Sequence, residues 1–419
     1  MDSKTLSSRL RELVQFLSTV KGDLANVTGP PSLLAPCSVV EVGRCWAERP
    51  HLFSAPALEP RADRRALLVL RWFLASLRSQ LYVGVDHAAH AAAAGKKKGK
   101  GTGPGVSIRK PLNAFLGELF LASWTTEEEP CKARTELVAE QVSHHPPITA
   151  MHICAKEHDV RADGYARVEM TFRASSGVLI RQVGHATLRV GRFEEEWLIP
   201  LPEVRVRGFL AGCLYPEIAG TYHIVGSSGW AVEMQFWGEG LVRGTRNSLS
   251  ARVYASREDM KKKQNAVYEV SGQWNVGWTV RECATGEVVE VYEVDAPENE
   301  PVAMETEPVE MQDSWETRRA WAGVLRGMAA GDMATVVAEK TQIEEAQRRM
   351  RANEAAKGVV WEPLFFRSCA GEEHAVFHKL VTGLDWPLHH ERTKGVWRVN
   401  EERVRKVQRP FRGDLTPLG

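Results

Sequence analysis

The 419-residue chain lacks a long apolar run, an excess of charge of either sign and closely paired cysteines. No stretch of 18 apolar residues occurs, and the longest candidate, Ala66 to Leu77, contains Arg71 and is too short to span a bilayer. Lys and Arg number 54 and Asp and Glu 53, so the net charge of +1 excludes a strongly basic nucleic-acid binder. The N-terminus has no unbroken apolar segment, which argues against a secretory signal.

The cysteines and the missing motifs narrow the class of protein further. Seven widely spaced cysteines without a CxxC pair favour a reducing compartment over a disulfide framework or a zinc knuckle. The chain has no GxSxG, no GK[ST] phosphate loop and no HExxH. Hydrophobic residues make up 43% of the chain, enough for a large core. We therefore expect a cytosolic globular protein that is not an enzyme and has no metal or cofactor.

Helical patterns occur in the first hundred residues. Residues 5–20 place leucines on one face, as in an amphipathic helix that either docks on its own core or acts as a lid or membrane-touching segment. A second, buried helix is predicted over residues 63–82, with Asp63 as its cap. A low-complexity stretch at about 88–105 predicts a loop, and its basic run Lys96–Lys100 is either simply solvated or attracted to an anionic membrane.

The middle of the chain is typical of a β protein. Between residues 114 and 296, short segments of alternating polarity are separated by turn signals, among them Ser227-Ser-Gly229. Many short strands at regular spacing predict a large antiparallel sheet that closes into a barrel or folds into a sandwich, and a barrel of this size would enclose a ligand cavity. The clearest predicted strands are Gly184–Val190, Trp230–Phe236, Leu249–Tyr254 and Trp274–Val280.

The C-terminal part returns to helical patterns. Two helices are predicted, one from Asp313 to about Ala330 and one over residues 333–356 that Asp332 caps. Residues 359–419 show no clear pattern. The predicted organisation is an amphipathic segment at 1–30, an N-terminal helical segment at 31–113, a β-barrel core at 114–296 and a C-terminal helical subdomain at 297–419.

The most distinctive segment is Glu140–Pro147, with the sequence EQVSHHPP. Two adjacent histidines on a regular strand would point to opposite faces, but Pro146 and Pro147 favour an irregular turn that can aim both imidazoles at one anion. A structural turn, a metal site and the base of a hydrolase are the alternatives. A third ligand at a diagnostic spacing is absent, which weakens the metal interpretation.

Two further segments carry candidate binding residues. Lys340, Glu344 and Arg348 are spaced to share one helix face, which is either a solvated salt-bridged face or a cationic site where Glu344 orients the two bases toward a phosphate. Lys110 and Asn113 flank the apolar run of KPLNAFLGELF at the entrance to the β region. By itself this last segment is only a loop that joins a strand.

Together the three segments resemble the oxysterol-binding protein family. EQVSHHPP matches the family signature at every residue, KPLNAFLGELF resembles KPxNPFLGE with Ala114 in place of Pro, and KTQIEEAQRRMR resembles KxxxExxQR. The resemblance covers nearly the whole chain and implies a mainly β fold: a near-complete antiparallel barrel around a lipid tunnel, with an N-terminal helical lid and flanking helices. It also implies a site for a phosphatidylinositol 4-phosphate headgroup, formed by Lys110, Asn113, His144, His145, Lys340, Glu344 and Arg348.

The resemblance places sterol contacts at the inner end of the tunnel, at Trp46, Gln80 and Gln182. Two further polar positions of sterol-binding members correspond here to Leu81, with Tyr82 beside it, and to Ala166. One lost hydrogen bond costs about 1 kcal/mol, whereas burial of a sterol-sized apolar body contributes several times more at ~25 cal/mol per Å². Sterol binding is therefore expected to survive, and another glycerophospholipid such as phosphatidylserine is the alternative second ligand.

The resemblance is to the short members of the family that consist of the lipid-binding domain alone. It implies a monomeric cytoplasmic protein, peripheral on intracellular membranes, which exchanges one sterol for one phosphatidylinositol 4-phosphate through a shared tunnel during transient membrane contact. No nucleic-acid partner is expected. Two alternatives remain open, a lipid sensor that binds the same ligands and presents a conformation to a partner, and a histidine-dependent hydrolase.

Overall fold

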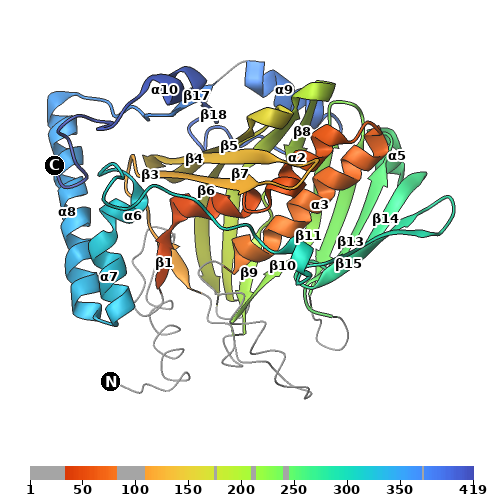
Figure 1. Cartoon of the computed structure of the whole chain (residues 1–419), viewed down its shortest axis with the longest axis horizontal. Helices are drawn as coiled ribbons and strands as arrows, with labels where there is room; N and C mark the ends of the chain where they lie inside the picture. Colours follow the sequence, from red (N-terminus) through yellow and green to blue (C-terminus); the bar gives the residue numbers. More distant parts are fainter. Residues whose placement is uncertain (1–33, 83–108, 174–176, 209–213, 239–244, 370–371) are drawn as a thin grey trace.

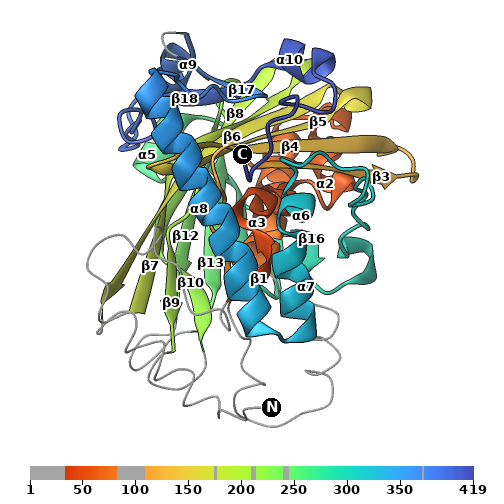
Figure 2. The same ribbon diagram turned by 90° about the vertical axis from the view of Figure 1, so that its left-hand side faces the viewer.

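The computed structural model describes residues 34–82, 109–173, 177–208, 214–238, 245–369 and 372–419 (Figure 1). The predicted lid at 1–30 and the predicted basic loop at 88–105 lie outside these residues. A strongly curved sheet occupies the centre of the molecule, the long helix α8 Met333–Lys357 runs along one side of it, and much of the chain after α8 lies along the top (Figures 1 and 2). In the described part of the chain, no helix combines the length and apolar composition needed to cross a membrane.

In the described residues the sheet contains 14 strands, all paired antiparallel, and most neighbours in sequence are neighbours in the sheet. The hairpin predicted at Ser227-Ser-Gly229 is confirmed, since it joins β11 to β12 and Gly229 has a φ of +99°. The prediction of a strand over Trp274–Val280 is wrong in its first half, because Val276 N–H donates to the Gln273 carbonyl and closes a turn. The Trp274 ring is buried in this turn, so the sequence shows the same alternation of apolar and polar residues as a strand. The strands are β3 Leu119–Thr126, β4 Ala133–His144, β5 Pro147–Ala155, β6 Val160–Arg173, β7 Gly177–Val190, β8 Glu195–Ile199, β9 Val204–Arg207, β10 Tyr215–Ile218, β11 Gly220–Gly226, β12 Ala231–Trp237, β13 Ser248–Tyr254, β14 Ala266–Gln273, β15 Gly277–Glu282 and β16 Val288–Glu293.

The chain after β16 covers the edge strand β3. Ser123 and Glu305 exchange two backbone hydrogen bonds of 2.9 and 2.8 Å, and Leu119 N–H donates to the Trp315 carbonyl at 2.9 Å. These contacts satisfy backbone groups that an exposed edge would leave open to association with other chains. The acidic segment after β16 therefore covers the β3 edge of the sheet.

Helices fill part of the concave side of the sheet. They are the 3-10 helix η3 Val39–Trp46, α2 Pro50–Leu58 and α3 Ala62–Leu81, whose apolar side chains share one core with the inner residues of the strands. The predicted helix at 63–82 is confirmed, although Asp63 lies in its first turn and accepts from the Tyr268 hydroxyl at 2.6 Å instead of capping it. Trp72 anchors α3 to η3, because its indole N–H donates to the Trp46 carbonyl at 2.8 Å.

The C-terminal elements pack on the outside of the sheet. The second predicted helix is confirmed as α8 Met333–Lys357, where the Asp332 carboxylate accepts from Ala334 and Thr335 and Gly358 ends the helix at a φ of +64°. The first predicted helix begins later than Asp313, since the hydrogen bond between Asp313 N–H and Glu316 closes a turn before it. The remaining elements are β1 Leu34–Ser38, β2 Lys110–Leu112, η4 Lys156–His158, η5 Gly191–Phe193, α5 Arg257–Lys262, η6 Pro297–Asn299, α6 Thr317–Ala320, α7 Ala322–Ala330, β17 Phe366–Cys369, α9 Glu372–Leu380, β18 Val396–Val399 and α10 Glu401–Lys406.

Two fully buried carboxyl groups join the sheet to these elements. Glu118 accepts hydrogen bonds from the Thr317 hydroxyl at 2.6 Å and the Trp321 indole at 3.0 Å. Glu140 accepts from the backbone N–H groups of Leu364 and Phe365 at 2.6 and 2.8 Å. Burial raises the pKa of both groups to about 7.

These two pKa values predict a stability that falls as the pH rises. Each carboxyl keeps its proton in the folded chain between its ordinary pKa of 4.5 and about 7, so its stabilisation is complete below that interval and is lost as the pH rises through about 7. A shift of this size corresponds to on the order of 3 kcal/mol per carboxyl. Urea unfolding at about pH 5 and about pH 8 should show this loss, and Glu118→Gln should reduce it. An identical pH dependence in the variant would contradict the assignment.

Candidate functional site

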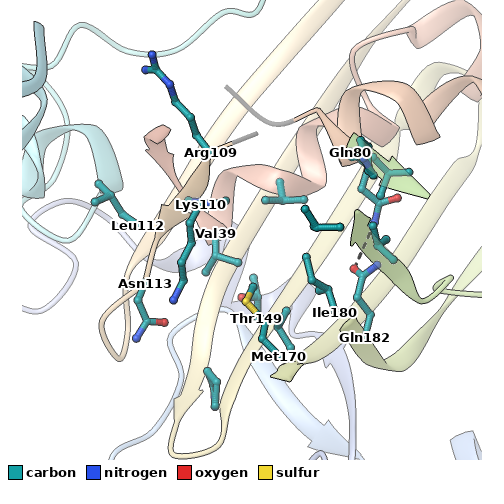
Figure 3. Close-up of a pocket in the computed structure, with 18 of the residues that line it drawn as sticks. Val39, Gln80, Arg109, Lys110, Leu112, Asn113, Thr149, Met170, Ile180 and Gln182 are labelled. Carbon is teal, nitrogen blue, oxygen red and sulfur yellow. Dashed lines mark hydrogen bonds between the residues drawn. The ribbon is translucent and has the colours of Figure 1, made fainter. Parts of the chain in front are cut away.

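The concave side of the sheet contains an open cavity next to η3 and the end of α3 (Figure 3). Its empty volume is about 980 Å³ including the part open to solvent. A second cavity of about 590 Å³ continues inward and shares six lining residues with the first. We call the two together the tunnel. Its aliphatic lining includes Val39, Val42, Leu81, Val168, Met170, Ile180, Val204 and Val206.

One side of the outer cavity carries Lys110 and Asn113, and Gln80 and Gln182 lie across from them (Figure 3). Lys110, on strand β2, and Asn113 line it together, and Figure 3 shows both side chains on the same wall. The chain turns sharply after Asn113, at Gly117, which has a φ of +81°. A Cβ atom at Gly117 would lie 2.2 Å from the Trp361 ring, so only glycine fits there. This side of the outer cavity is the mouth of the tunnel.

The two histidines of EQVSHHPP lie at the turn between β4 and β5. Their ring centroids are 4.6 Å apart, so the turn brings the imidazoles together as predicted. His144 Nδ1 lies 2.9 Å from the carbonyl oxygen of Ala114, which joins the signature segment to the Lys110–Phe120 segment. Burial, and next the charge of His145, lower the pKa of His144. His144 is therefore neutral near pH 7 with its hydrogen on Nδ1, and Nε2 is an acceptor.

Helix α8 contributes an ion pair to the same region. Lys340 is buried and bonds to Glu344, one turn along the helix. The Glu344 charge raises the pKa of His144, which places this carboxylate near the histidine pair. Arg348, one turn further, is exposed. The structure thus connects Lys340 and Glu344 with His144, and leaves Arg348 at the solvent-facing end of the predicted row.

Two arginines over the Trp361 ring were not predicted from the sequence. Arg351 lowers the pKa of His144 and stacks on the Trp361 ring, with 4.6 Å between the guanidinium carbon and the ring centroid. Arg412, from the C-terminal tail, covers the same ring at 3.9 Å. Arg351 continues the row of Lys340, Glu344 and Arg348 and could have been found by helical spacing, whereas no local pattern singles out Trp361.

The residues predicted to contact sterol all line the inner cavity of the tunnel. Trp46 lines the inner cavity, and Gln80 and Gln182 line both cavities. Gln80 Nε2 donates to Gln182 Oε1 at 3.3 Å, and Gln182 Nε2 donates to the Pro202 carbonyl at 3.2 Å. Leu81 and Ala166 also line the tunnel. These two apolar side chains occupy the positions at which sterol-binding members of the family are expected to have polar groups. The neighbouring Tyr82 ring faces Trp274, 6.3 Å away.

The described residues offer no group of three or more His, Cys, Asp or Glu side chains that could hold a metal ion. What they form is an aliphatic tunnel inside a curved antiparallel sheet, with basic and imidazole groups near its mouth and paired amides at its inner end. Such an arrangement is typical of proteins that enclose one amphiphilic lipid, since the apolar body leaves water while polar groups select the head.

Comparison with known proteins identifies the family. The sequence profile described as oxysterol-binding protein matches residues 99–323, more than half of the chain. Protein kes1 of Schizosaccharomyces pombe is 33% identical over 365 residues, which cover 86% of this chain and 87% of that protein. The chain belongs to the oxysterol-binding protein family. The probable transporter efuK of Hormonema carpetanum is 41% identical over 408 residues, 97% of this chain, although the chain spans only 54% of that relative's length.

Solved structures share the fold. The ORD domain of Osh1 in complex with cholesterol has a TM-score of 0.65 at 19% identity, and 92% of each chain is covered. The Osh3 ORD of Saccharomyces cerevisiae in complex with PI(4)P has a TM-score of 0.61 at 16% identity, with 90% of this chain and 95% of that chain covered. The predicted mainly β architecture is therefore confirmed.

Proposed function

We propose that the chain is a lipid transfer protein that carries one sterol or one phosphatidylinositol 4-phosphate in its tunnel and exchanges them between membranes. The observation that carries the proposal is the continuity of the two cavities through six shared residues. One tunnel with a basic mouth and an amide pair at its inner end suits both an inositol phosphate head and a sterol hydroxyl, but not both lipids at once. The ligands named for the Osh1 and Osh3 domains support this pairing.

The headgroup site comprises the seven residues named from the sequence. Lys110 and Asn113 supply donors at the mouth, and Lys340 with Arg348 supplies positive charge that Glu344 orients. His145 supplies an imidazole N–H group, and His144 supplies one once its Nε2 atom is protonated. Sterol is assigned to Trp46, Gln80 and Gln182. Because Leu81 and Ala166 cannot bond to a hydroxyl, the alternative counter-lipid is phosphatidylserine.

We propose the following oligomeric state and membrane contact for this exchange. The chain acts as a monomer on the cytoplasmic side, touches membranes only transiently and releases its lipids chemically unchanged. Recovery of intact lipid after many rounds of transfer between donor and acceptor liposomes tests the last point. A product formed from the phosphoinositide and lost in His144→Ala would favour the hydrolase. Rapid transfer of lipid between the liposomes would favour a transporter over a sensor.

Native mass spectrometry of the lipids that co-purify with the chain is the direct test. It should be followed by competition between a fluorescent sterol and phosphatidylinositol 4-phosphate in liposomes. One bound sterol per chain, displaced by the phosphoinositide, would support the shared tunnel. Phosphoinositide binding without sterol would contradict the sterol assignment and point to another counter-lipid, and binding of neither would contradict the proposal.

Affinity for the phosphoinositide should rise as the pH falls from about 8 to about 6. His144 is neutral in the free chain, and a phosphate that accepts from Nε2 requires the second proton, so binding takes up a proton. Liposome extraction measured across this range should show the increase for the phosphoinositide, whereas sterol binding stays constant. Because the phosphate itself titrates at about pH 6, the comparison is with His144→Gln, whose pH dependence should be weaker. Equal slopes in the two proteins would contradict the role of His144.

A further inference from the structure

The wall of the tunnel is interrupted along β7. Val178–Ile180 of this strand pair with β9, whereas Ala186–Val190 pair with β8. Within the described part of the chain, no strand pairs with Arg181–His185 on that side of β7. The segment that leads from β8 to β9 contains Pro200 and Pro202, which have no N–H group to donate to β7. Residues 200–203 run beside Arg181–His185, four residues opposite five, and make no ladder hydrogen bonds to them. We call this break in the hydrogen-bond ladder the gap.

Two side chains fill the gap. Gln182 comes from β7 and is held at both ends of its amide, by Gln80 on the tunnel side and by the Pro202 carbonyl in the gap. Leu201 comes from the segment between β8 and β9 and lines the inner cavity beside Gln182. We call these two side chains the plug. Both are only partly buried.

A polar pocket lies on the other side of the plug. It is bounded by the outer face of β7, by β11 and by residues 385–393 of the C-terminal part, and its empty volume is about 1380 Å³ including the part open to solvent. Gln182, Leu201 and Tyr165 line this outer pocket as well as the inner cavity, so the two spaces border on the same residues. The pocket is lined by polar groups that suit water, among them Arg181, Glu203, Tyr222, His223, His389 and Arg392.

We propose that this gap is a side window through which water passes between the inner cavity and the outer pocket while a lipid moves through the mouth. A lipid that enters a tunnel blocks the mouth behind it, and the water ahead of it then needs another exit. The Gln182 amide, the Tyr222 hydroxyl and the unpaired backbone of β7 give water hydrogen-bond partners in the window, which the aliphatic tunnel wall does not. The inference rests on the proposed lipid-binding function of the tunnel.

Filling the outer pocket should slow exchange without changing affinity. Thr221, an exposed residue of β11, lines the pocket from outside and does not line the tunnel. In Thr221→Trp the association and dissociation rate constants of a fluorescent sterol should fall by the same factor, on the order of threefold or more, because a passage lowers a barrier and leaves the end states unchanged. Gln235→Trp is the matched control, since Gln235 is exposed, lies opposite Thr221 on β12 and does not line the pocket.

Collisional quenching of the bound sterol by acrylamide tests the route independently of these rates. Leu201→Ala should open the window and raise the quenching constant, and addition of Thr221→Trp should reverse the rise. The sterol is excited directly, so that fluorescence from the new tryptophan does not contribute to the measured emission. Thermal unfolding of each variant shows whether it is folded.

The outcomes separate the window from the proposed function. Rate constants in Thr221→Trp equal to those of Gln235→Trp, or quenching in Leu201→Ala that Thr221→Trp leaves unchanged, would overturn the window while sterol binding stands. If the unmodified chain binds no sterol, the same measurements are made with phosphatidylinositol 4-phosphate that carries a fluorescent acyl chain. Failure to bind either lipid would overturn the lipid-binding function and the window with it.

Discussion

Replacement of both His144 and His145 by glutamate is expected to abolish extraction of phosphatidylinositol 4-phosphate while sparing most sterol binding. The change removes two N–H donors near the mouth and places two carboxylates where the phosphate should bind. One pair of like charges about 4 Å apart costs on the order of 4 kcal/mol at an effective dielectric constant of about 20. A loss of at least about 100-fold in phosphoinositide affinity follows, since about 1.4 kcal/mol corresponds to tenfold.

The measurement is extraction of each lipid from liposomes, with the two lipids assayed separately. His378→Glu is the control for an added carboxylate elsewhere, because His378 is exposed on α9, at the opposite side of the sheet from the tunnel. Its phosphoinositide extraction should equal that of the unmodified chain. Equal loss of sterol and phosphoinositide in the double variant would contradict separate positions for the headgroup and the sterol.

Val168→Trp is expected to abolish binding of both lipids. Val168 lines the outer and the inner cavity, so a tryptophan there occupies the point where they join. Any ligand that reaches the inner end must pass this point, and the loss for each lipid should be at least about 100-fold because the indole and the ligand compete for one volume. Loss of only one lipid would contradict the shared tunnel.

The control for this variant is Arg189→Trp. Arg189 is exposed on the neighbouring strand β7 and carries the same new side chain on the outside of the sheet. Overpacking of a well-filled core costs about 1–3 kcal/mol, but the tunnel has empty volume, so Val168→Trp should unfold close to the temperature of the control. A large drop in that temperature would attribute lost binding to misfolding, and Ile180→Trp would then replace it as the test, because Ile180 lines the outer cavity.

Local features of the chain could be predicted from the sequence because their causes are local. The end of α8 at Gly358 and its start at Asp332 follow from capping chemistry within a few residues. The turn at the two histidines follows from the adjacent prolines, and the buried helix α3 follows from its apolar periodicity. Conversely, the helix predicted to begin at Asp313 begins later. The hydrogen bond from Asp313 N–H to the Glu316 carboxylate resembles a helix cap in the sequence but closes a turn here.

Only part of the candidate site could be predicted from the sequence. The three motifs supplied Lys110, His144 and Lys340 as residue types suited to a phosphate, but their meeting depends on contacts between distant segments. The hydrogen bond of His144 to Ala114 and the effect of Glu344 on the pKa of His144 are two such contacts. The headgroup and sterol roles of these residues remain predictions.

The sequence by itself determined the family, the mainly β core and the composition of the three binding segments, because signatures, periodicity and caps are read along the chain. Only the tertiary structure decided that the C-terminal tail covers the sheet, that Trp361 packs on Gly117, and that β7 changes partner between β9 and β8. These features depend on pairing and packing between residues far apart in sequence, for which no local pattern exists. The tunnel and its side window belong to this second group, since a cavity is formed by what surrounding elements leave unfilled.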